Sequence, residues 1–543
     1  YLRSVIQIIK FCKLSRNISL AELKCFHIII VPKVLGLYDS ILESRGLYGI
    51  VKLHTFSWEL MSLDDQVLSL ELPFLFKQLF VEQNNSLLSS ISMSIWSLFH
   101  ITGKPKAIDF VDTHSSKEIG ALIVIDRNQD YASSLLTPAT YSGLLSELFN
   151  ITCGHLDLNV KETKLKKGKL NFNEEASGAT KCTSMTLDSS IDNLYGEIKH
   201  RHFSEVLSVL SSKAKLLKNE DIKALGIQEI KHFVQTKLQQ VTMFKQNLVN
   251  HVLACETVIS EMSKKYESLK LTETEMLNNR NKKSNFNFVD ENFGTDIHIY
   301  YSLRLMCLLS LTQGLSYDEY NTLVNKYLLA FGYKYMYVFN NLINAGLLVQ
   351  PSCPKLSLNI PNLGNLSDRL PKWQNEFQIT ANKLKQLPSQ PEKVGTTSPS
   401  YVFNGGYIPL IAVLCNVLLA AVSLNEVVTK LSALPDLKIG GSVLESLKDG
   451  IETLNEKLSN LKLQSDLEFG CKDVKSLLKL LKNDPNVGGY FPLKPKSVLV
   501  YVVGGVNYAE IGACNVVQMS MGGKIYIASD CIASGSDLMA ANT

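Results

Sequence analysis

The distribution of proline along the chain constrains the fold more than any other feature. The sequence of 543 residues contains 16 prolines, yet none lies between Ala139 and Gln350. Proline costs about 3 kcal/mol inside a helix, so a stretch this long without it is typical of a mostly helical domain. We therefore expect helices through the middle of the chain and a different architecture on either side.

Hydrophobic spacing in this proline-free stretch supports the same prediction. Apolar residues recur at steps of three and four from Ile227 to Leu269, which predicts a long amphipathic helix, broken once, or a helical hairpin. An earlier helix should begin after Ser189, which can cap it, with Asp192 three residues further on. The inner face of that helix would carry Ile191, Leu194, Tyr195 and Ile198.

Short runs of branched apolar residues flank the helical middle. They are Phe26–Val31, Ala121–Ile125, Val498–Val503 and Lys524–Ser529. Continuous apolar runs of this length suit strands buried on both faces, as in a parallel sheet. The last two runs enclose Gly504-Gly505, a helix over Tyr508–Met519 and Gly522-Gly523, an order that predicts a βαβ unit. The sequence therefore predicts an α/β domain, split by an inserted helical domain.

Composition and motifs argue against several classes of function. A net charge of +4 gives no strong steering toward nucleic acid, and 11 cysteines without a C-x-x-C pair indicate reduced thiols rather than disulfides or zinc. The run GGVNYAEIG lacks the spacing of a dinucleotide fingerprint. His200-Arg201-His202 is interpreted as a surface basic patch. We expect no catalytic residues, no cofactor and no metal, and a protein that works by binding other proteins.

One uncharged segment resembles a membrane span. Tyr407–Leu424 is 18 residues long, close to the minimum for a spanning helix. Its larger apolar side chains fall mostly on one stripe, which favours a helix buried on one side, in a core or an interface, with a membrane helix as the alternative. The expected stripe contains Leu410, Val413, Leu414, Val417, Leu418 and Val422.

The most informative polar cluster follows the apolar run at Ala121–Ile125. Asp126, Arg127 and Asp130 come at the end of that strand, and Tyr141 and Glu147 follow on an expected helix. Charges at the end of a buried strand must be paired or solvated. We expect the two acids and the arginine to form a network that joins the sheet to the helices that follow.

This cluster resembles the hallmark of the Sec/Munc family of proteins that regulate SNAREs, in which an apolar strand ends in an Asp-Arg-x-x-Asp run. Further segments resemble the vacuolar-protein-sorting 33 branch of that family, some of them its B-type members. They include Leu194–Val206, Ser211–Lys215, Ile230–Val234, Tyr401–Leu410 and Val502–Ile511, with Ile151–Leu158, Leu253–Ile259 and Ser302–Thr312 for the B type.

The resemblance implies an arch of three domains, the third inserted into the second. Residues 1–33 would be a remnant of the first domain, 34–130 and 401–543 the two parts of the α/β second domain, and 131–400 the mainly helical third domain. It also implies binding of syntaxin-type SNAREs and of a Vps-sixteen-type tethering subunit, with Rab effectors as a further class of partner. Nucleic acid is not an expected partner.

The same resemblance implies where partners bind. The hairpin over residues 246–268 would contact SNAREs, with Gln246, Val252, Ile259 and Tyr266 as candidate contacts. The tethering subunit would dock near Tyr407 and Leu410. Core packing is the alternative for these residues.

The implied function is control of SNARE assembly on late endosome, lysosome or recycling endosome membranes, reached from the cytoplasm through partners. The alternatives are a scaffold subunit without SNARE binding and a nucleotide-binding α/β enzyme.

Overall fold

The computed structural model describes residues 26–30, 36–44, 46–49, 51–55, 60–102, 119–158, 184–219, 238–262, 266–293, 299–349, 351, 373–388, 397–420 and 497–542. The chain divides into two compact units, residues 1–59 and 60–543. The domain bounds expected at residues 33, 130 and 400 stay predictions.

The first unit contains a small parallel sheet. Strand β1 (Phe26–Ile30) pairs in parallel with β2 (Val51–Thr55), and helix α2 (Gly36–Ser44) lies between them in sequence. Leu42, Leu47 and Val51 form the core of this unit. The prediction that β1 is buried on both faces is wrong, because its residues alternate between partly buried and exposed.

The second unit is built on a five-stranded sheet of order β3-β4-β10-β9-β5. Its strands are β3 (Met61–Asp64), β4 (Val67–Ser69), β5 (Ala121–Asp126), β9 (Ser497–Val503) and β10 (Lys524–Ser529). All neighbouring strands pair in parallel except β3 with β4. Every residue of β9 is buried. The strands that precede and follow the helical middle therefore form one sheet, as the apolar runs predicted.

The βαβ unit near the C-terminus is confirmed. Helix α21 (Tyr508–Met521) connects β9 to β10. Gly504 and Gly505 make the turn with φ values of 97° and 101°, a region that other residues rarely adopt. Asn507 then caps α21, and Glu510 closes a capping box with it. Local sequence thus determines how β9 passes into α21.

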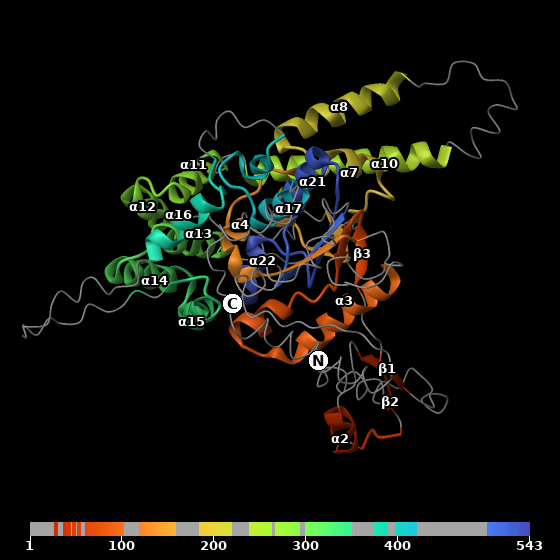
Figure 1. Cartoon of the computed structure of the whole chain (residues 1–543), viewed down its shortest axis with the longest axis horizontal. Helices are drawn as coiled ribbons and strands as arrows, with labels where there is room; N and C mark the ends of the chain where they lie inside the picture. Colours follow the sequence, from red (N-terminus) through yellow and green to blue (C-terminus); the bar gives the residue numbers. More distant parts are fainter. Residues whose placement is uncertain are drawn as a thin grey trace, which may run out of the picture. The chain divides into compact units, whose positions relative to one another are not determined.

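The middle of the chain is mainly helical (Figure 1). Helix α8 (Phe203–Asn219) contacts α10 (Leu238–Met262), and the two lie along one side of the unit. The other helices of this region are α7 (Asn193–Ile198), α11 (Tyr266–Leu277), α12 (Lys282–Asn292), α13 (Ile299–Thr312), α14 (Tyr317–Phe331), α15 (Met336–Asn344) and α16 (Trp373–Lys383). The long apolar series is therefore divided between α10 and α11, and its beginning, residues 227–237, lies outside the described residues.

Short elements connect the helices to the sheet. Helices α4 (Tyr131–Leu135) and α5 (Tyr141–Leu148) follow β5, and α22 (Gly535–Asn542) follows β10. Helix α22 contacts both α13 of the helical region and α4. The remaining described elements are α3 (Leu88–Thr102), the small sheet of β6 (Ile151–Thr152), β7 (His155–Asp157) and β8 (Ser184–Thr186), the π-helical η1 (Lys77–Val81), and the 3-10 segments η2 (Asn85–Leu87), η3 (Arg127–Gln129), η5 (Tyr333–Tyr335) and η8 (Pro399–Phe403).

The predicted start of α7 needs a correction. Asp192, not Ser189, caps this helix by accepting from the backbone amides of Leu194 and Tyr195. The Ser189 amide and hydroxyl donate instead to Asp64, at the end of β3, which also pairs with Lys199 at 2.7 Å. Leu194, Tyr195 and Ile198 are buried as expected. Ile191 is 58% exposed, because it precedes the helix.

Helix α17 (Leu410–Ala420) is a buried helix of the second unit. No helix in the described residues is long and apolar enough to cross a membrane. The expected stripe is only partly correct. Leu410 and Leu414 are buried, but so are Ile411, Ala412 and Cys415, whereas Val413, Val417 and Leu418 are partly exposed. Small residues lie inside because α17 packs closely against α21. Val422 lies outside the described residues.

The interpretation of residues 200–202 as a surface patch also needs a correction. Arg201 is exposed, but His200 is half-buried and its Nδ1 is enclosed without a hydrogen-bond partner in the described part of the chain. Burial lowers the pKa of His200 to about 3, so this ring is neutral. The two ring nitrogens of His202 form hydrogen bonds: Nδ1 with the Ser204 hydroxyl and Nε2 with the side-chain oxygen of Asn404.

Candidate functional site

The charged cluster at the end of β5 is buried, but its pairing differs from the expected one. The Arg127 guanidinium lies 2.7 Å from Glu510 of α21, and it also donates to the backbone carbonyl of Asp130. Burial works to lower the pKa of Arg127, but the Glu510 carboxylate outweighs it and raises that pKa. The arginine is therefore charged, and it ties β5 to the βαβ unit.

Asp126 takes no part in this network, contrary to the prediction. Its side chain is 3% exposed, and neither carboxyl oxygen has a hydrogen-bond partner in the described residues. Burial raises the pKa of Asp126 to about 6. The third residue of the expected network, Asp130, meets Arg127 only through its backbone carbonyl, and its carboxylate has other partners.

Asp130 joins three elements through its side chain. It caps α4 by accepting from the Ser133 amide, and it also accepts from the Ser133 hydroxyl at 2.6 Å. The Tyr407 hydroxyl donates to one carboxyl oxygen at 2.9 Å, and the Leu410 amide donates to the other at 2.8 Å. The Asp-Arg-x-x-Asp run is thus a structural junction between the sheet, α4 and the beginning of α17.

Tyr141, the fourth residue of the motif, begins a buried chain of polar side chains. Its hydroxyl lies 2.8 Å from Nδ1 of His251 on α10, and Nε2 of His251 lies 3.0 Å from the Asp192 carboxylate. Tyr141 and His251 are fully buried and Asp192 is 3% exposed. The ring of Tyr195 stacks on His251, with 6.3 Å between the ring centroids. We call the three hydrogen-bonded residues Tyr141, His251 and Asp192 the Tyr-His-Asp chain.

A second buried ion network joins helices α5, α11 and α13. Arg304 of α13 lies 2.9 Å from Glu147 of α5 and 3.8 Å from Glu273 of α11, and it also donates to the Thr137 hydroxyl. Glu147 in turn accepts from the Gly535 amide at the start of α22. Arg304 was not predicted as a site residue, although a lone arginine inside the apolar run of α13 is an unusual residue.

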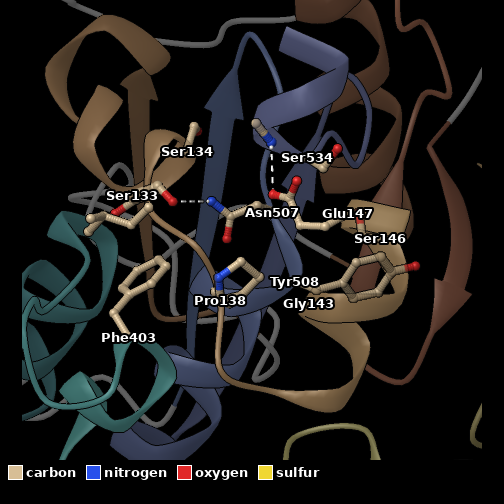
Figure 2. Close-up of a pocket in the computed structure, with 13 residues that line it drawn as sticks. Ser133, Ser134, Pro138, Gly143, Ser146, Glu147, Phe403, Asn507, Tyr508 and Ser534 are labelled. Atoms are coloured by element: carbon tan, nitrogen blue, oxygen red, sulfur yellow. Dashed lines mark hydrogen bonds between the residues drawn. The ribbon is translucent and has the colours of Figure 1, made fainter. Parts of the chain in front are cut away.

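Between α4, α5 and α21 the structure leaves a cavity of about 10 Å³. Figure 2 shows Asn507 directed at Ser133, whose carbonyl oxygen accepts from the Asn507 amide at 2.9 Å, and Glu147 at the amide of Gly535. A cavity of this size is close to the smallest that holds one water molecule. It offers no room for a substrate.

The edge of the sheet where α/β proteins usually bind ligands is filled by side chains. A methyl group placed on Gly504 would lie 2.6 Å from the Phe80 ring and 2.9 Å from Cβ of Arg127. In the described residues, no group of three or more His, Cys, Asp or Glu side chains is arranged to hold a metal ion.

The residues expected to bind partners fall into two groups. Tyr407 and Leu410 are 2% and 1% exposed, so both side chains pack in the core of this structure. Core packing was the alternative that the sequence left open for them. Gln246, Val252 and Ile259 of α10 are exposed. Tyr266, at the start of α11, is half-buried, and its hydroxyl accepts from Asn404. Their roles in partner binding stay predictions.

The exposed face of α10 carries five large apolar side chains, interspersed with polar ones such as Lys245, Gln246 and Glu256. Its large side chains are 41–57% exposed, although the helix packs closely on its other side. We call this set the α10 stripe, and it consists of Met243, Val249, Val252, Leu253 and Ile259. Leu207 and Leu216 on the neighbouring helix α8 are 43% and 60% exposed. Apolar residues gathered on one helix face are typical of a surface that receives another helix.

A second exposed apolar cluster lies at the end of α14 and the start of α15, at the left of the view in Figure 1. Its residues are 64–79% exposed, more than those of the α10 stripe. We call it the α14–α15 patch, and it consists of Leu329, Tyr333, Met336 and Tyr337. This patch was not predicted from the sequence. The aromatic run Tyr333–Tyr337 next to Gly332 was the available signal.

The comparison with protein families decides the relationship of this chain to known proteins. Residues 2–541 match the family described as Sec1 family. The chain belongs to the Sec1 family. This confirms the resemblance on which the sequence analysis relied, and the α/β sheet with its helical region is the fold of this Sec1-family chain.

Relatives and solved structures agree with this assignment. Vacuolar protein sorting-associated protein 33B of Rattus norvegicus is 26% identical over 425 residues, which are 71% of this chain and 66% of the rat protein. Vacuolar protein sorting-associated protein 33 of Schizosaccharomyces pombe is 24% identical and covers 90% of this chain and 78% of the yeast protein. The Unc18–syntaxin 1 complex from Monosiga brevicollis contains a chain with a TM-score of 0.53 and 15% identity, covering 95% of this chain and 82% of that one. The match thus spans just under two thirds of the rat protein's length.

Proposed function

We propose that this protein regulates SNARE assembly during vesicle docking and fusion, and that it does so by binding helices rather than by catalysis. Membership of the Sec1 family supports this, and so does the similarity in fold to a chain solved in complex with syntaxin 1. The observation that carries the proposal is the α10 stripe, five large apolar side chains that are 41–57% exposed on a helix that contacts α8. A SNARE helix would bury this face as a third helix along the pair.

The proposed location is the cytoplasmic side of late endosome, lysosome or recycling endosome membranes. The similarity to vacuolar protein sorting-associated proteins 33B and 33 supports an endosomal or vacuolar route. The protein would reach the membrane through its partners, a Vps-sixteen-type tethering subunit first and Rab effectors as a further class.

The α14–α15 patch is the better candidate for docking of the tethering subunit. Tyr407 and Leu410, the residues first expected to mark that site, are buried and bonded to Asp130. The patch offers two exposed tyrosines, and aromatic residues dominate the binding energy of many protein interfaces. Tyr333 and Tyr337 would be its central contacts.

The test is a binding assay with two variants that serve as controls for each other. Val249→Asp with Leu253→Asp places charges in the α10 stripe, and Tyr333→Asp with Tyr337→Asp does the same in the α14–α15 patch. All four side chains are exposed, so we expect folding to be retained. The full chain, with either variant, is offered endosomal SNARE helices and the Vps-sixteen-type subunit in separate pull-downs.

We expect the stripe variant to lose at least about tenfold in SNARE affinity and to keep the tethering subunit, because central interface contacts can each cost about 2 kcal/mol or more and about 1.4 kcal/mol is tenfold in affinity. The patch variant should behave in the opposite way. Absence of SNARE binding by the unaltered chain, with tethering intact, would instead favour the scaffold alternative. Micromolar binding of a labelled nucleotide would favour the enzyme alternative.

A further inference from the structure

The Tyr-His-Asp chain and the α10 stripe lie on opposite faces of the same helix. Successive residues of an α-helix are rotated by about 100°, so Val249 and Leu253, two positions either side of His251, each lie about 160° from it. Val249 is 57% exposed and Leu253 43% exposed, whereas His251 is fully buried. The rotation of α10 about its axis therefore decides which residues face solvent.

Apolar packing alone specifies that rotation weakly. The apolar side chains on the buried face around His251 are Leu248, Ala254, Cys255, Val258 and Met262, and the polar Asn250 and Thr257 are buried beside them. Apolar contact is not directional, and small side chains leave a helix several similar ways to pack. Hydrogen bonds are directional, and buried polar groups left without partners are costly. The two hydrogen bonds of His251 therefore supply the directional contacts that fix the rotation of α10.

We propose that His251 is a positioning residue that sets the rotation of α10 and so presents the α10 stripe to its partner. Both hydrogen-bond partners of His251, Tyr141 and Asp192, are themselves held in place by backbone hydrogen bonds. Tyr141 begins α5, and its amide donates to the Arg201 carbonyl at 3.1 Å. Asp192 is held as the cap of α7 by the amides of Leu194 and Tyr195. A rotation of α10 by one residue would break both bonds of His251 at once.

This inference rests on the proposed function for its biological meaning, but its test does not. The critical variant combines Tyr141→Phe, His251→Leu and Asp192→Ser. It removes the hydrogen bonds without leaving a buried charge, and serine still caps α7. The second variant, Gly535→Ala, loosens the structure elsewhere, because its new methyl group would overlap the Ser134 carbonyl oxygen.

The readout is the labelling of two thiols on α10 in the full chain. Val249→Cys introduces a thiol into the stripe, and the native Cys255, fully buried, reports the opposite face. Maleimide labelling at each position is measured by peptide mass spectrometry. With the Tyr-His-Asp chain intact, the stripe thiol should react at least about tenfold faster than Cys255, as expected for exposed and protected positions.

In the triple variant we expect this rate ratio to fall at least about threefold while the thermal transition stays cooperative, since alternative rotations become populated. The Gly535→Ala variant should keep the ratio. SNARE affinity should fall in the triple variant in proportion to the ratio. An unchanged ratio in the triple variant, or an equal fall in Gly535→Ala, would overturn the proposal. If the ratio falls but the unaltered chain binds no SNARE, the positioning role holds and the proposed function fails.

Discussion

Replacing Asp126 by asparagine tests whether a buried carboxylate without hydrogen-bond partners in the described residues destabilises this protein. Burial raises the pKa of Asp126 from 3.8 to about 6. The folded protein therefore holds this proton more tightly than the unfolded chain does. As the pH rises from about 4 to 6, the unfolded state loses the proton first, and the free energy of unfolding falls across that window.

The expected gain in stability follows from the size of the pKa shift of Asp126. A rise of about two pKa units, at about 1.4 kcal/mol each, makes the charged carboxylate cost about 3 kcal/mol at neutral pH. An asparagine side chain cannot ionise and has nearly the same shape, so Asp126→Asn should recover most of that cost. For a unit of this size we expect Tm to rise by about 3 to 5 °C at pH 7.5, with little change near pH 4.5.

The assay is thermal unfolding of the full chain and the variant, followed by circular dichroism at pH 4.5, 6 and 7.5. Asp65→Asn, at an exposed aspartate in the turn after β3, is the matched control and should leave Tm unchanged at every pH. The reasoning is refuted if Asp126→Asn fails to raise Tm at pH 7.5, or raises it equally at pH 4.5.

Three further substitutions test the buried contacts. Arg304→Met should destabilise by about 3 to 5 kcal/mol, because Glu147 and Glu273 lose their cation, and chemical denaturation of the purified chain would measure it. Asn507→Ala removes the cap of α21 and should cost about 1 kcal/mol in the same assay, whereas Asn507→Ser should cost less. Asp192→Asn should destabilise at pH 7 and progressively less as the pH falls below about 4, since burial, which raises the pKa of Asp192, is outweighed by the hydrogen bond with His251, which lowers it. A Tm for Asp192→Asn that is unchanged at pH 7 would contradict this.

The sequence alone determined the elements whose causes are local. The long absence of proline predicted the helical middle, and Gly504-Gly505 and Gly522-Gly523 on either side of Tyr508–Met519 predicted the turns and the helix between β9 and β10. Runs of branched apolar residues likewise marked β5, β9 and β10. Turn conformation, helix capping and strand propensity depend on neighbours within a few residues, so one sequence is enough to read them.

The tertiary structure decided everything that depends on distant partners. Arg127 pairs with Glu510, 383 residues away, rather than with the adjacent Asp126. Tyr407 and Leu410 are core residues because Asp130 binds both, and the α14–α15 patch is exposed because no described element covers it. Periodicity predicts that a helix has an apolar face, but not which face is covered. That choice is made by hydrogen bonds and packing between segments that only the folded chain brings together.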